Sequence, residues 1–403
     1  MRLPAPDTEA RSGTDRGGPF HFFLRGPYPA DGPRRGVMTT AHGVVQTPAF
    51  MPVGTQATVK TLLPSEVRDT GAQIILANTY HLMLRPGLDT LRAAGGLHAF
   101  MGWRGPILTD SGGFQIFSLG GNVKVRERGV TFRSHIDGSA RELTPEGAVA
   151  LQLGWGSDIL MPLDHLVGLP AETRVVCDAM DRTHRWLERA VAAFAEYDGA
   201  ATSALFGICQ GGMDEALRRE SAATLAAADV AGCAIGGLSV GEPKPVMAAM
   251  LEAVTPLLPI DKPRYLMGVG SPEDLWMGVA RGVDLFDCVL PTRLARNGAL
   301  FTPEGRVNIK QRRYAEQHAP LDESCDCGAC TEFSAAYIHH LFRAREILGL
   351  RLASVHNLRF LAREMERIRA SIEHGAFAAA YRDFEARYRP VGAAANEAAA
   401  GDA

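Results

Sequence analysis

Eight short apolar runs recur along this chain of 403 residues, and nearly every run ends in glycine or a polar residue. The segments between the runs carry helical signals. Thr144-Pro145-Glu146 and Ser271-Pro272-Glu273 each combine an N-cap residue, a proline at the first helical position and an acidic first turn. Short continuous apolar strands that alternate with helices predict a parallel α/β sheet. The runs span residues 47–55, 73–80, 106–113, 157–165, 205–212, 232–241, 264–270 and 283–293.

Eight such strand–helix units are typical of the (β/α)₈ TIM barrel. A doubly wound open sheet is the alternative, but no Gly-x-Gly-x-x-Gly motif follows the first run. Residues 121–143 alternate in polarity and contain turn signals, which predicts a β-hairpin set inserted after the third strand. The segments 20–26 and 39–45 predict antiparallel strands that cap the barrel floor.

The composition is that of a soluble globular protein with a sizeable core, since 46% of the residues are hydrophobic and 22% are charged. No window approaches the roughly 18 uninterrupted apolar residues of a membrane span, and the N-terminus lacks the apolar core of a secretory signal. We therefore expect a cytoplasmic protein outside the membrane. The net charge of −3 means that an RNA partner would have to bind a local basic patch.

In a TIM barrel the chemistry takes place at the carboxyl ends of the strands. A strand-end aspartate or glutamine often only caps the next helix, but several of them around one mouth favour a functional ring. The residues at these ends are Asp110, Asp164, Gln210, the pair Gly236-Gly237, Gly268 and Asp287.

The segment from Asp284 to Gly298 places one carboxylate, Asp287, in an apolar strand that Pro291 should end. An unpaired charge among hydrophobic residues is costly, and Arg293 and Arg296 follow directly. Two interpretations remain open. Asp287 is either a nucleophile beside an anionic substrate or a strand-end aspartate in a salt bridge with Arg293.

Three cysteines, Cys325, Cys327 and Cys330, fall within six positions of a turn-rich segment. Three thiolates this close predict zinc, which takes four ligands in a closed tetrahedral site when it is structural. The fourth ligand should be a histidine: His318, His339, His340 and His356 are the candidates. His356 follows a predicted helix over residues 337–348, where the chain can fold back, whereas His339 and His340 lie inside that helix; the four candidates stay open on these residues alone. A fully protein-ligated zinc stabilises a small subdomain.

Several basic residues lie between Asp287 and the cysteines. They form either a solvated charged face or, beside an active-site mouth, a phosphate-backbone contact, which we favour. These residues are Arg293, Arg296, Lys310, Arg312 and Arg313.

Six motifs together resemble those of the bacterial tRNA-guanine transglycosylases, also called queuine tRNA-ribosyltransferases, from about residue 20 to beyond residue 360. The resemblance implies a pentosyltransferase that exchanges guanine at the wobble position of tRNAs with GUN anticodons (Asp, Asn, His, Tyr) for a 7-deazaguanine, through a covalent ribosyl-aspartate intermediate of queuosine biosynthesis. The motifs are LTDSGGFQ (108–115), FGICQGG (206–212), IGGLSVGEP (235–243), YLMGVGSPED (265–274), FDCVLPTR (286–293) and the cysteine cluster with His356.

The same resemblance implies residue roles. Asp287 matches the nucleophile and Asp110 the proton acceptor and general acid–base. Substrate-binding positions, with Phe114 and Met267 on the two faces of the purine, are Asp110, Ser111, Gly112, Gly113, Phe114, Asp164, Gln210, Gly237, Leu238 and Met267. RNA-binding positions are Gly268, Val269, Gly270, Ser271, Pro272, Glu273, Asp274, Thr292, Arg293, Leu294, Ala295 and Arg296. One Zn²⁺ per subunit of a homodimer would be bound by Cys325, Cys327, Cys330 and His356.

Two positions bear on the incoming base. Bacterial members usually carry Glu-Cys after the residue matched by Asp164, whereas this chain carries His165-Leu166, closer to eukaryotic relatives. Val240 is the bacterial residue where eukaryotic members carry glycine, and its branched side chain should shrink the pocket. We therefore expect 7-aminomethyl-7-deazaguanine as the incoming base, with queuine as the alternative.

Three other functions fit these residues less well. A non-catalytic, tRNA-binding family subunit would not need both Asp287 and Asp110. An archaeal-type enzyme would need extra C-terminal domains, and a metal-dependent hydrolase would need converging open-site ligands such as His-x-His. The expected organisation is a disordered lead (1–18), the barrel with its capping strands (19–300), the zinc subdomain with C-terminal helices (301–388) and a flexible tail (389–403).

Overall fold

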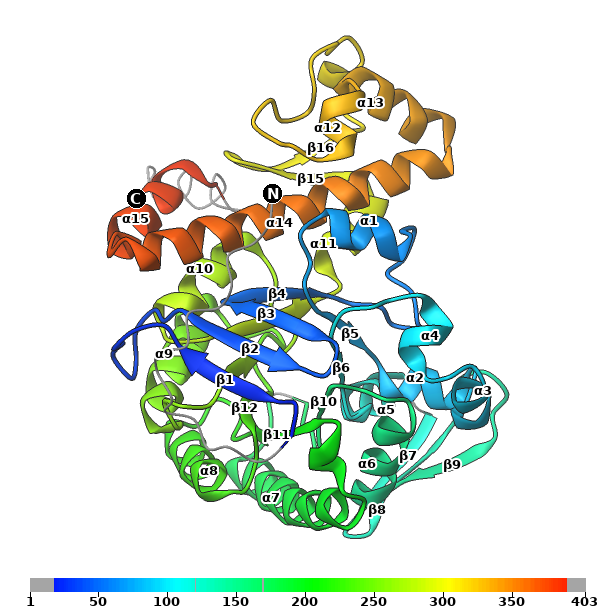
Figure 1. The fold of residues 1–403 in the computed structure, drawn as a ribbon, viewed down its shortest axis with the longest axis vertical. Coiled ribbons are helices and arrows are strands. Elements are labelled where there is room, and N and C mark those ends of the chain that lie inside the picture. The colour runs from blue at the N-terminus through cyan, green and yellow to red at the C-terminus, as the bar shows by residue number, and fades with distance from the viewer. Residues whose placement is uncertain (1–17, 120, 169, 390–403) are drawn as a thin grey trace.

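The computed structural model describes residues 18–119, 121–168 and 170–389, and its centre is a parallel eight-stranded barrel (Figure 1). The strands follow the order β4-β14-β13-β12-β11-β10-β6-β5, and a parallel bridge between Val53 and Leu76 joins the two ends. The predicted barrel is therefore confirmed and the open doubly wound sheet is wrong. The strands are β4 (Ala49–Pro52), β5 (Ile75–Ala77), β6 (Ile107–Thr109), β10 (Ile159–Leu160), β11 (Ala204–Cys209), β12 (Gly232–Ile235), β13 (Arg264–Leu266) and β14 (Leu285–Cys288).

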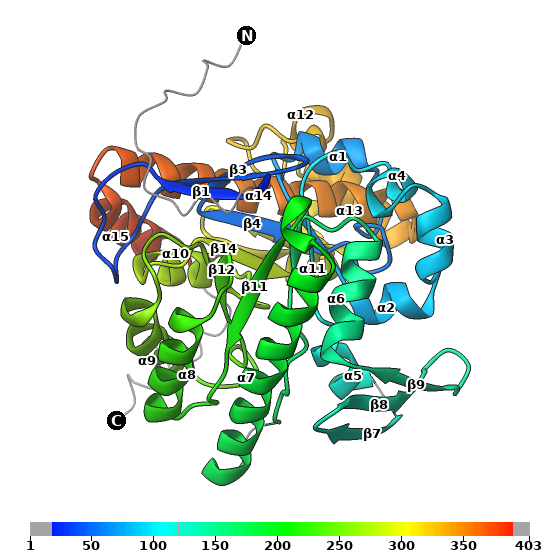
Figure 2. The same ribbon diagram turned by 60° about the horizontal axis from the view of Figure 1, so that its bottom comes forward.

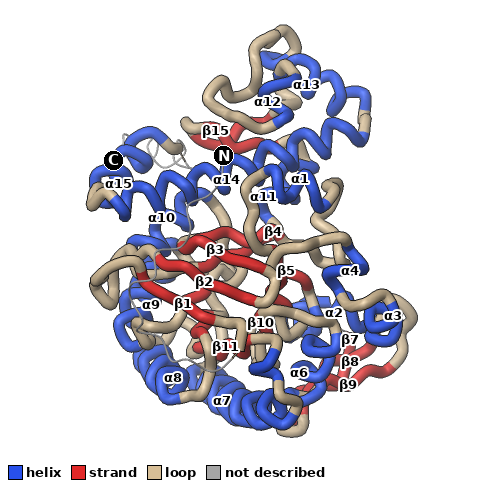
Figure 3. Tube along the Cα trace, in the orientation of Figure 1, coloured by secondary structure: helices blue, strands red, loops and turns tan. Residues whose placement is uncertain are grey.

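Helices surround the strands, as the tube in Figure 3 shows in blue around red. The two predicted N-caps are confirmed, because the side chains of Thr144 and Ser271 accept hydrogen bonds from the first turns of α6 and α10. In Figure 2, α7, α8 and α9 stand along the outside of the barrel. The barrel helices are α1 (Pro64–Asp69), α2 (Thr79–Leu84), α3 (Leu88–Ala93), α4 (Leu97–Met101), α5 (Gly113–Leu119), α6 (Pro145–Gly154), α7 (Thr173–Glu196), α8 (Glu215–Ala227), α9 (Lys244–Val254), α10 (Pro272–Ala280) and α11 (Leu290–Arg296).

An antiparallel sheet of β1 (His21–Leu24), β2 (Gly36–Thr40) and β3 (Gly43–Thr47) closes the barrel floor, as predicted. Phe22, Met38 and Val45 belong to the same buried cluster as the side chains that fill the barrel interior. Arg34, just before β2, pairs with Asp284, which lies just before β14, and neither side chain is exposed to solvent. The N-terminal strands are thus bound to the amino end of the barrel.

The predicted insertion forms a second antiparallel sheet of β7 (Gly121–Arg126), β8 (Gly129–Arg133) and β9 (Ala140–Leu143). The turn between β7 and β8 contacts α7, where Glu127 accepts hydrogen bonds from Arg182 and Arg185. The sheet therefore lies outside the barrel, beside α5 and α6 (Figure 2).

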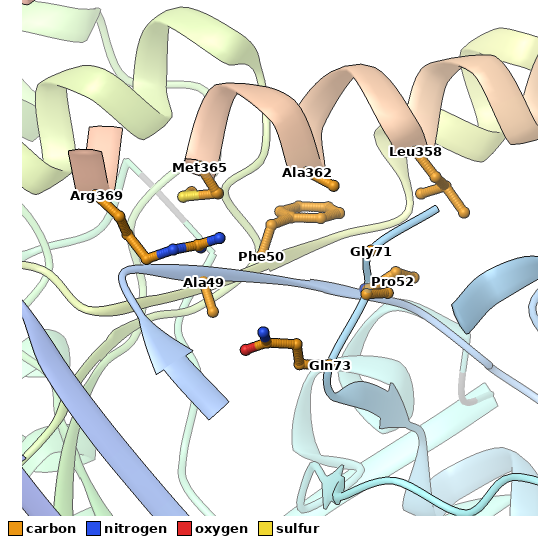
Figure 4. A pocket seen from close by; sticks show the side chains of 10 residues that line it. Ala49, Phe50, Pro52, Gly71, Gln73, Leu358, Ala362, Met365 and Arg369 are labelled. Carbon is orange, nitrogen blue, oxygen red and sulfur yellow. The ribbon is translucent and has the colours of Figure 1, made fainter. Parts of the chain in front are cut away.

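The longest helix, α14 (Ile347–Glu373), runs between the barrel and the cysteine-bearing segment (Figure 1). Figure 4 shows Met365 and Arg369 of α14 over Ala49 and Phe50 of β4, around a cavity of about 20 Å³. The Arg369 guanidinium donates to the Pro48 carbonyl across this contact, at 2.9 Å. Although α14 comes late in the sequence, it covers one side of the barrel.

The cysteine-bearing segment has its own buried cluster, which includes Leu300, Ile309 and Ile338. Its elements are β15 (Ala299–Thr302), β16 (Gly305–Asn308), α12 (Gly328–Glu332) and α13 (Ala335–Ala344), and α15 (Phe377–Arg387) follows α14. The division of the chain at residue 300 stays a prediction. Nearly all of the predicted lead and tail, residues 1–17 and 390–403, lie outside the described residues. Within the described ranges, no helix is both long and apolar enough to cross a membrane.

Candidate active site and metal centre

Asp110 follows β6 directly, and its buried carboxylate accepts four N–H hydrogen bonds. The donors are the Asn78 amide at 2.5 Å, the Thr79 backbone at 2.8 Å, the Gly112 backbone at 3.1 Å and the Gln115 amide at 2.8 Å. Burial raises the pKa of Asp110, and these donors oppose that rise because they favour the ionised form. The group is thus held in place by neutral dipoles.

Asp287 is the third residue of β14 and is also buried. Its Oδ1 accepts hydrogen bonds from the Tyr265 hydroxyl at 2.6 Å and from the Gly268 N–H at 2.7 Å, whereas Oδ2 has no hydrogen-bond partner within the described residues. Burial raises the pKa of Asp287 to about 6. Asp287 makes no ion pair with Arg293 in the described structure, so the salt-bridge interpretation is not supported. Pro291 does not end the strand either, because it lies in the first turn of α11.

Asp164 lies just beyond the end of β10 and accepts hydrogen bonds from two side chains. Gln210 Nε2 donates to its Oδ2 at 2.8 Å, and the Ser111 hydroxyl donates to its Oδ1 at 3.2 Å. Burial raises the pKa of Asp164 to about 6. The Gly113 Cα lies so close that an added Cβ would be 2.8 Å from Oδ1, which explains the glycine at that position.

The three carboxylates lie at the same end of the barrel. The charge of Asp110 raises the pKa values of both Asp164 and Asp287, which requires that the groups be close. Asp110 and Asp287 are not on adjacent strands, because β4 and β5 lie between β6 and β14 in the sheet order. They share the mouth of a narrow barrel.

A cavity of about 260 Å³ adjoins Gln210 and Gly237, and Phe114 lies on its wall. Leu166 and Val240, the two positions at which the family pattern diverges, also line it. Phe114 is 55% exposed, which leaves a face of its ring free for a partner. The cavity therefore has the mixed apolar and polar lining that suits a flat heterocycle.

Not every predicted binding residue offers its side chain. Leu238, Val269 and Ala295 are buried in hydrophobic clusters, so they present only backbone to a ligand. Met267 follows β13 and packs against the interior cluster. Arg293 is exposed, and Nη1 of Arg296 is buried without a hydrogen-bond partner in the described structure.

Cys325, Cys327, Cys330 and His356 converge, with all four ligand atoms within 4.8 Å of one another. His356 Nδ1 lies 3.3 Å from Cys330 Sγ and 3.8 Å from Cys327 Sγ, which matches the edge of a tetrahedral zinc site. Its Nε2 contacts the Phe301 carbonyl at 2.7 Å, which leaves Nδ1 free to bind a metal. The residues therefore fit a closed structural zinc site. His356 follows the predicted helix, which is α13, and itself lies inside the next helix, α14.

Three contributors were missed in the sequence. Asn78 stands at the end of the second apolar run and could have been included with the other strand-end residues. In the sequence, Tyr265 has the pattern of an ordinary buried aromatic residue inside a strand. Arg218, on α8, is fully buried and binds the loops around Gln210 and Gly237, but nothing in the helical pattern distinguishes it from a surface arginine.

A barrel with coupled carboxylates at its mouth and a closed Cys₃His site at its side is the architecture of a zinc-bearing barrel enzyme. Residues 30–390 match the model of the queuine tRNA-ribosyltransferase family. The queuine tRNA-ribosyltransferase of Herpetosiphon aurantiacus is 58% identical over 91% of this chain and 92% of its own length. That of Symbiobacterium thermophilum is 57% identical over 87% of each chain. The chain belongs to the queuine tRNA-ribosyltransferase family.

We predict that His356→Ala lowers zinc affinity by at least ~100-fold and lowers the thermal unfolding midpoint, because an inner ligand is lost. The measurement is metal content by mass spectrometry after dialysis, combined with calorimetry. His340→Ala, which changes an exposed histidine of α13, is the matched control and should retain one zinc per chain. Stoichiometric zinc in His356→Ala would rule out the ligand set.

Proposed function

We propose that this protein exchanges guanine at the wobble position of GUN-anticodon tRNAs for a 7-deazaguanine, as a pentosyltransferase of queuosine biosynthesis. The observation that carries the proposal is the pair of buried carboxylates, Asp287 and Asp110, whose charges interact at the barrel mouth. Family membership supports the reaction type. Two carboxylates are the minimum for replacing a base on an intact ribose with retention of configuration.

Retention requires two displacements and hence a covalent intermediate. Asp287 Oδ2, which has no partner in the described structure, attacks C1′ while the bond from C1′ to guanine breaks. Asp110, in its protonated form, donates its proton to the departing base and becomes the carboxylate. The incoming base then attacks the same carbon as Asp110 accepts its proton, and the Asp287 ester bond breaks.

Tyr265 and Gly268 both donate to the other oxygen of Asp287. These two bonds orient the carboxylate and oppose the rise in its pKa caused by burial. A pKa of about 6 leaves Asp287 mostly ionised at neutral pH, so it can attack without a separate base. The ionised form also favours the positive charge that develops on the ribose.

Asp164, Gln210 and Gly237 are proposed to recognise the base. Guanine offers two donors, N1–H and the exocyclic amine, which an ionised Asp164 can accept. The second amide hydrogen of Gln210 and the Gly237 N–H are available for O6. The base must leave its stack to reach this pocket, which costs less in an anticodon loop than in a duplex.

The incoming base is proposed to be 7-aminomethyl-7-deazaguanine. Val240 and Leu166 both narrow the cavity beside Gly237, which favours a small 7-substituent. Queuine is the alternative. The zinc supplies no step of this chemistry, because its four protein ligands close the site.

The tRNA backbone is proposed to bind along α11. Arg293 and Arg296 are close enough for each charge to affect the other, and the pKa of Arg296 is lowered by burial and by Arg293. A phosphate between them would relieve that repulsion and give Arg296 Nη1 an acceptor. The protein is proposed to work in the cytoplasm, where its tRNA substrates are found.

A homodimer is proposed from an apolar patch, which comprises Leu63, Tyr337, Ile347 and Leu348. Their exposed fractions are 54%, 39%, 73% and 38%. The Arg351–Glu66 salt bridge at 2.7 Å brings the start of α14 beside α1, so Leu63 lies near Ile347 and Leu348, and Tyr337 lies on the preceding helix, α13. Exposed large hydrophobic residues gathered in this way are typical of protein–protein interfaces.

We predict that Asp287→Asn and Asp287→Ala lose at least ~10⁴-fold in exchange rate, because no other group can form the ribosyl ester. The measurement is incorporation of labelled guanine into a GUN-anticodon tRNA, with folding and zinc content checked. Cys288→Ala changes the neighbouring residue and should exchange normally. Normal exchange by Asp287→Ala would disprove the mechanism.

We predict that kcat/KM for the tRNA, which reports the free enzyme, falls as the pH drops through about 6, where Asp164 and Asp287 are each half protonated. Because both must be ionised, the loss between pH 7.5 and pH 5 should be roughly 100-fold. In Asp164→Asn, the remaining activity should fall with half that steepness. A flat profile down to pH 5, with zinc retained, would contradict the assignment.

We predict that Ile347→Glu shifts the protein to monomer, because it places a charge in the proposed interface. Sedimentation velocity at micromolar concentration is the measurement. Val44→Glu, at a residue of the barrel floor that is 50% exposed, is the control and should sediment as the native protein does. An unchanged dimer in Ile347→Glu would place the interface elsewhere.

A further inference from the structure

Arg218 is a fully buried cation whose guanidinium binds backbone carbonyls. Its Nε donates to Gly212 O at 2.8 Å, and its Nη1 donates to Gly236 O at 2.7 Å and to Cys209 O at 3.3 Å. Its Nη2 donates to Gly237 O at 3.2 Å. Within the described residues it forms no ion pair. Burying an unpaired charge costs free energy. Charge-assisted hydrogen bonds, which a neutral side chain cannot form, offset that cost here.

The carbonyls belong to the two loops that flank the proposed base pocket. One loop, after β11, carries Gln210, and the other, after β12, carries Gly236 and Gly237. Gly237 has a φ of +66°, and an added Cβ would lie 2.5 Å from Gln210 Oε1, so glycine is required there. Glycine-rich loops have much conformational freedom to lose, and Arg218 bonds both of them to α8.

The geometry of the peptide unit gives this contact a direction. In a planar trans peptide, the C=O of Gly236 and the N–H of Gly237 point to opposite sides. The bond from Arg218 to Gly236 O therefore turns the Gly237 N–H away from the guanidinium. That N–H has no acceptor within the described residues, and Gly237 lines the 260 Å³ cavity.

We propose that Arg218 is a positioning residue for base recognition. It acts through Gly236 and Gly237 to aim the Gly237 N–H at the O6 acceptor of the purine. The inference rests on the proposed function, since it needs guanine as the ligand of this pocket. Arg218 therefore increases the affinity for purines that carry a carbonyl oxygen at C6, although its side chain does not contact the base.

The experiment compares guanine with 2-aminopurine, which lacks O6 and also the N1–H donor. Both bases are measured as competitors of labelled-guanine exchange in the native protein and in Arg218→Lys. Because Asp164 is the same in the native protein and in the variant, the change between the two proteins isolates the contact to O6. Lysine keeps the charge but not the planar fork that reaches four carbonyls. We expect the inhibition constant of guanine to rise by ~10- to 100-fold in the variant, and that of 2-aminopurine to change by less than about twofold.

The matched control is Arg34→Lys. Arg34 is equally buried, donates to the carbonyls of Ile260 and Lys262, and lies at the opposite end of the barrel. It should lose stability without any change in either inhibition constant. A purely structural role for Arg218 would weaken both bases equally or neither, and either result overturns the proposal.

A second measurement needs no variant, should Arg218→Lys fail to fold. In the native protein guanine should inhibit at least ~10-fold more strongly than 2-aminopurine, which lacks both O6 and N1–H. Equal inhibition constants would mean that the Gly237 N–H does not bind O6, which would overturn the proposal. Failure of the proposed function would look different, because the native protein would then exchange no guanine at all.

Discussion

The charge of Asp110 raises the pKa of both Asp164 and Asp287, because all three carboxylates are buried at one end of a narrow barrel. Burying even one carboxylate without a cation is unfavourable, and like charges nearby add to the cost. The rest of the fold must supply the stability that this arrangement removes. The hydrophobic packing of the floor sheet on the barrel interior and of α14 on β4 contributes to that stability.

The chain compensates these carboxylates with neutral donors, namely backbone N–H groups, amides and hydroxyls. A directly paired arginine would lower the pKa values far below neutrality and weaken the carboxylates as bases and nucleophiles. Neutral dipoles hold each group in place while its pKa stays near 6, as in Asp164 and Asp287. The cations Arg293 and Arg296 lie on α11 beyond the strand end, where a polyanion could meet them.

Periodicity and strand-end chemistry were enough to predict all eight barrel strands, the ring of polar residues and the cysteine cluster. They could not predict which members of a helix face inward. Arg218 and Arg219 are neighbours on α8, yet Arg218 is fully buried while the Arg219 side chain is 51% exposed and pairs with Glu215. Sequence patterns do not separate the two, since the contacts that distinguish them are to backbone carbonyls outside the helix, 6 to 19 residues away in the sequence. Tyr265 was missed for the same reason, because its hydroxyl partner lies on the next strand.

His356 lies in the N-terminal half of helix α14. Met365 and Arg369, further along the same helix, pack over β4. The same helix therefore contributes a ligand to the metal centre and packs against the wall of the barrel. Loss of the metal would free His356 and thereby remove a contact that fixes α14, so it should also weaken the packing of Met365 and Arg369 on β4.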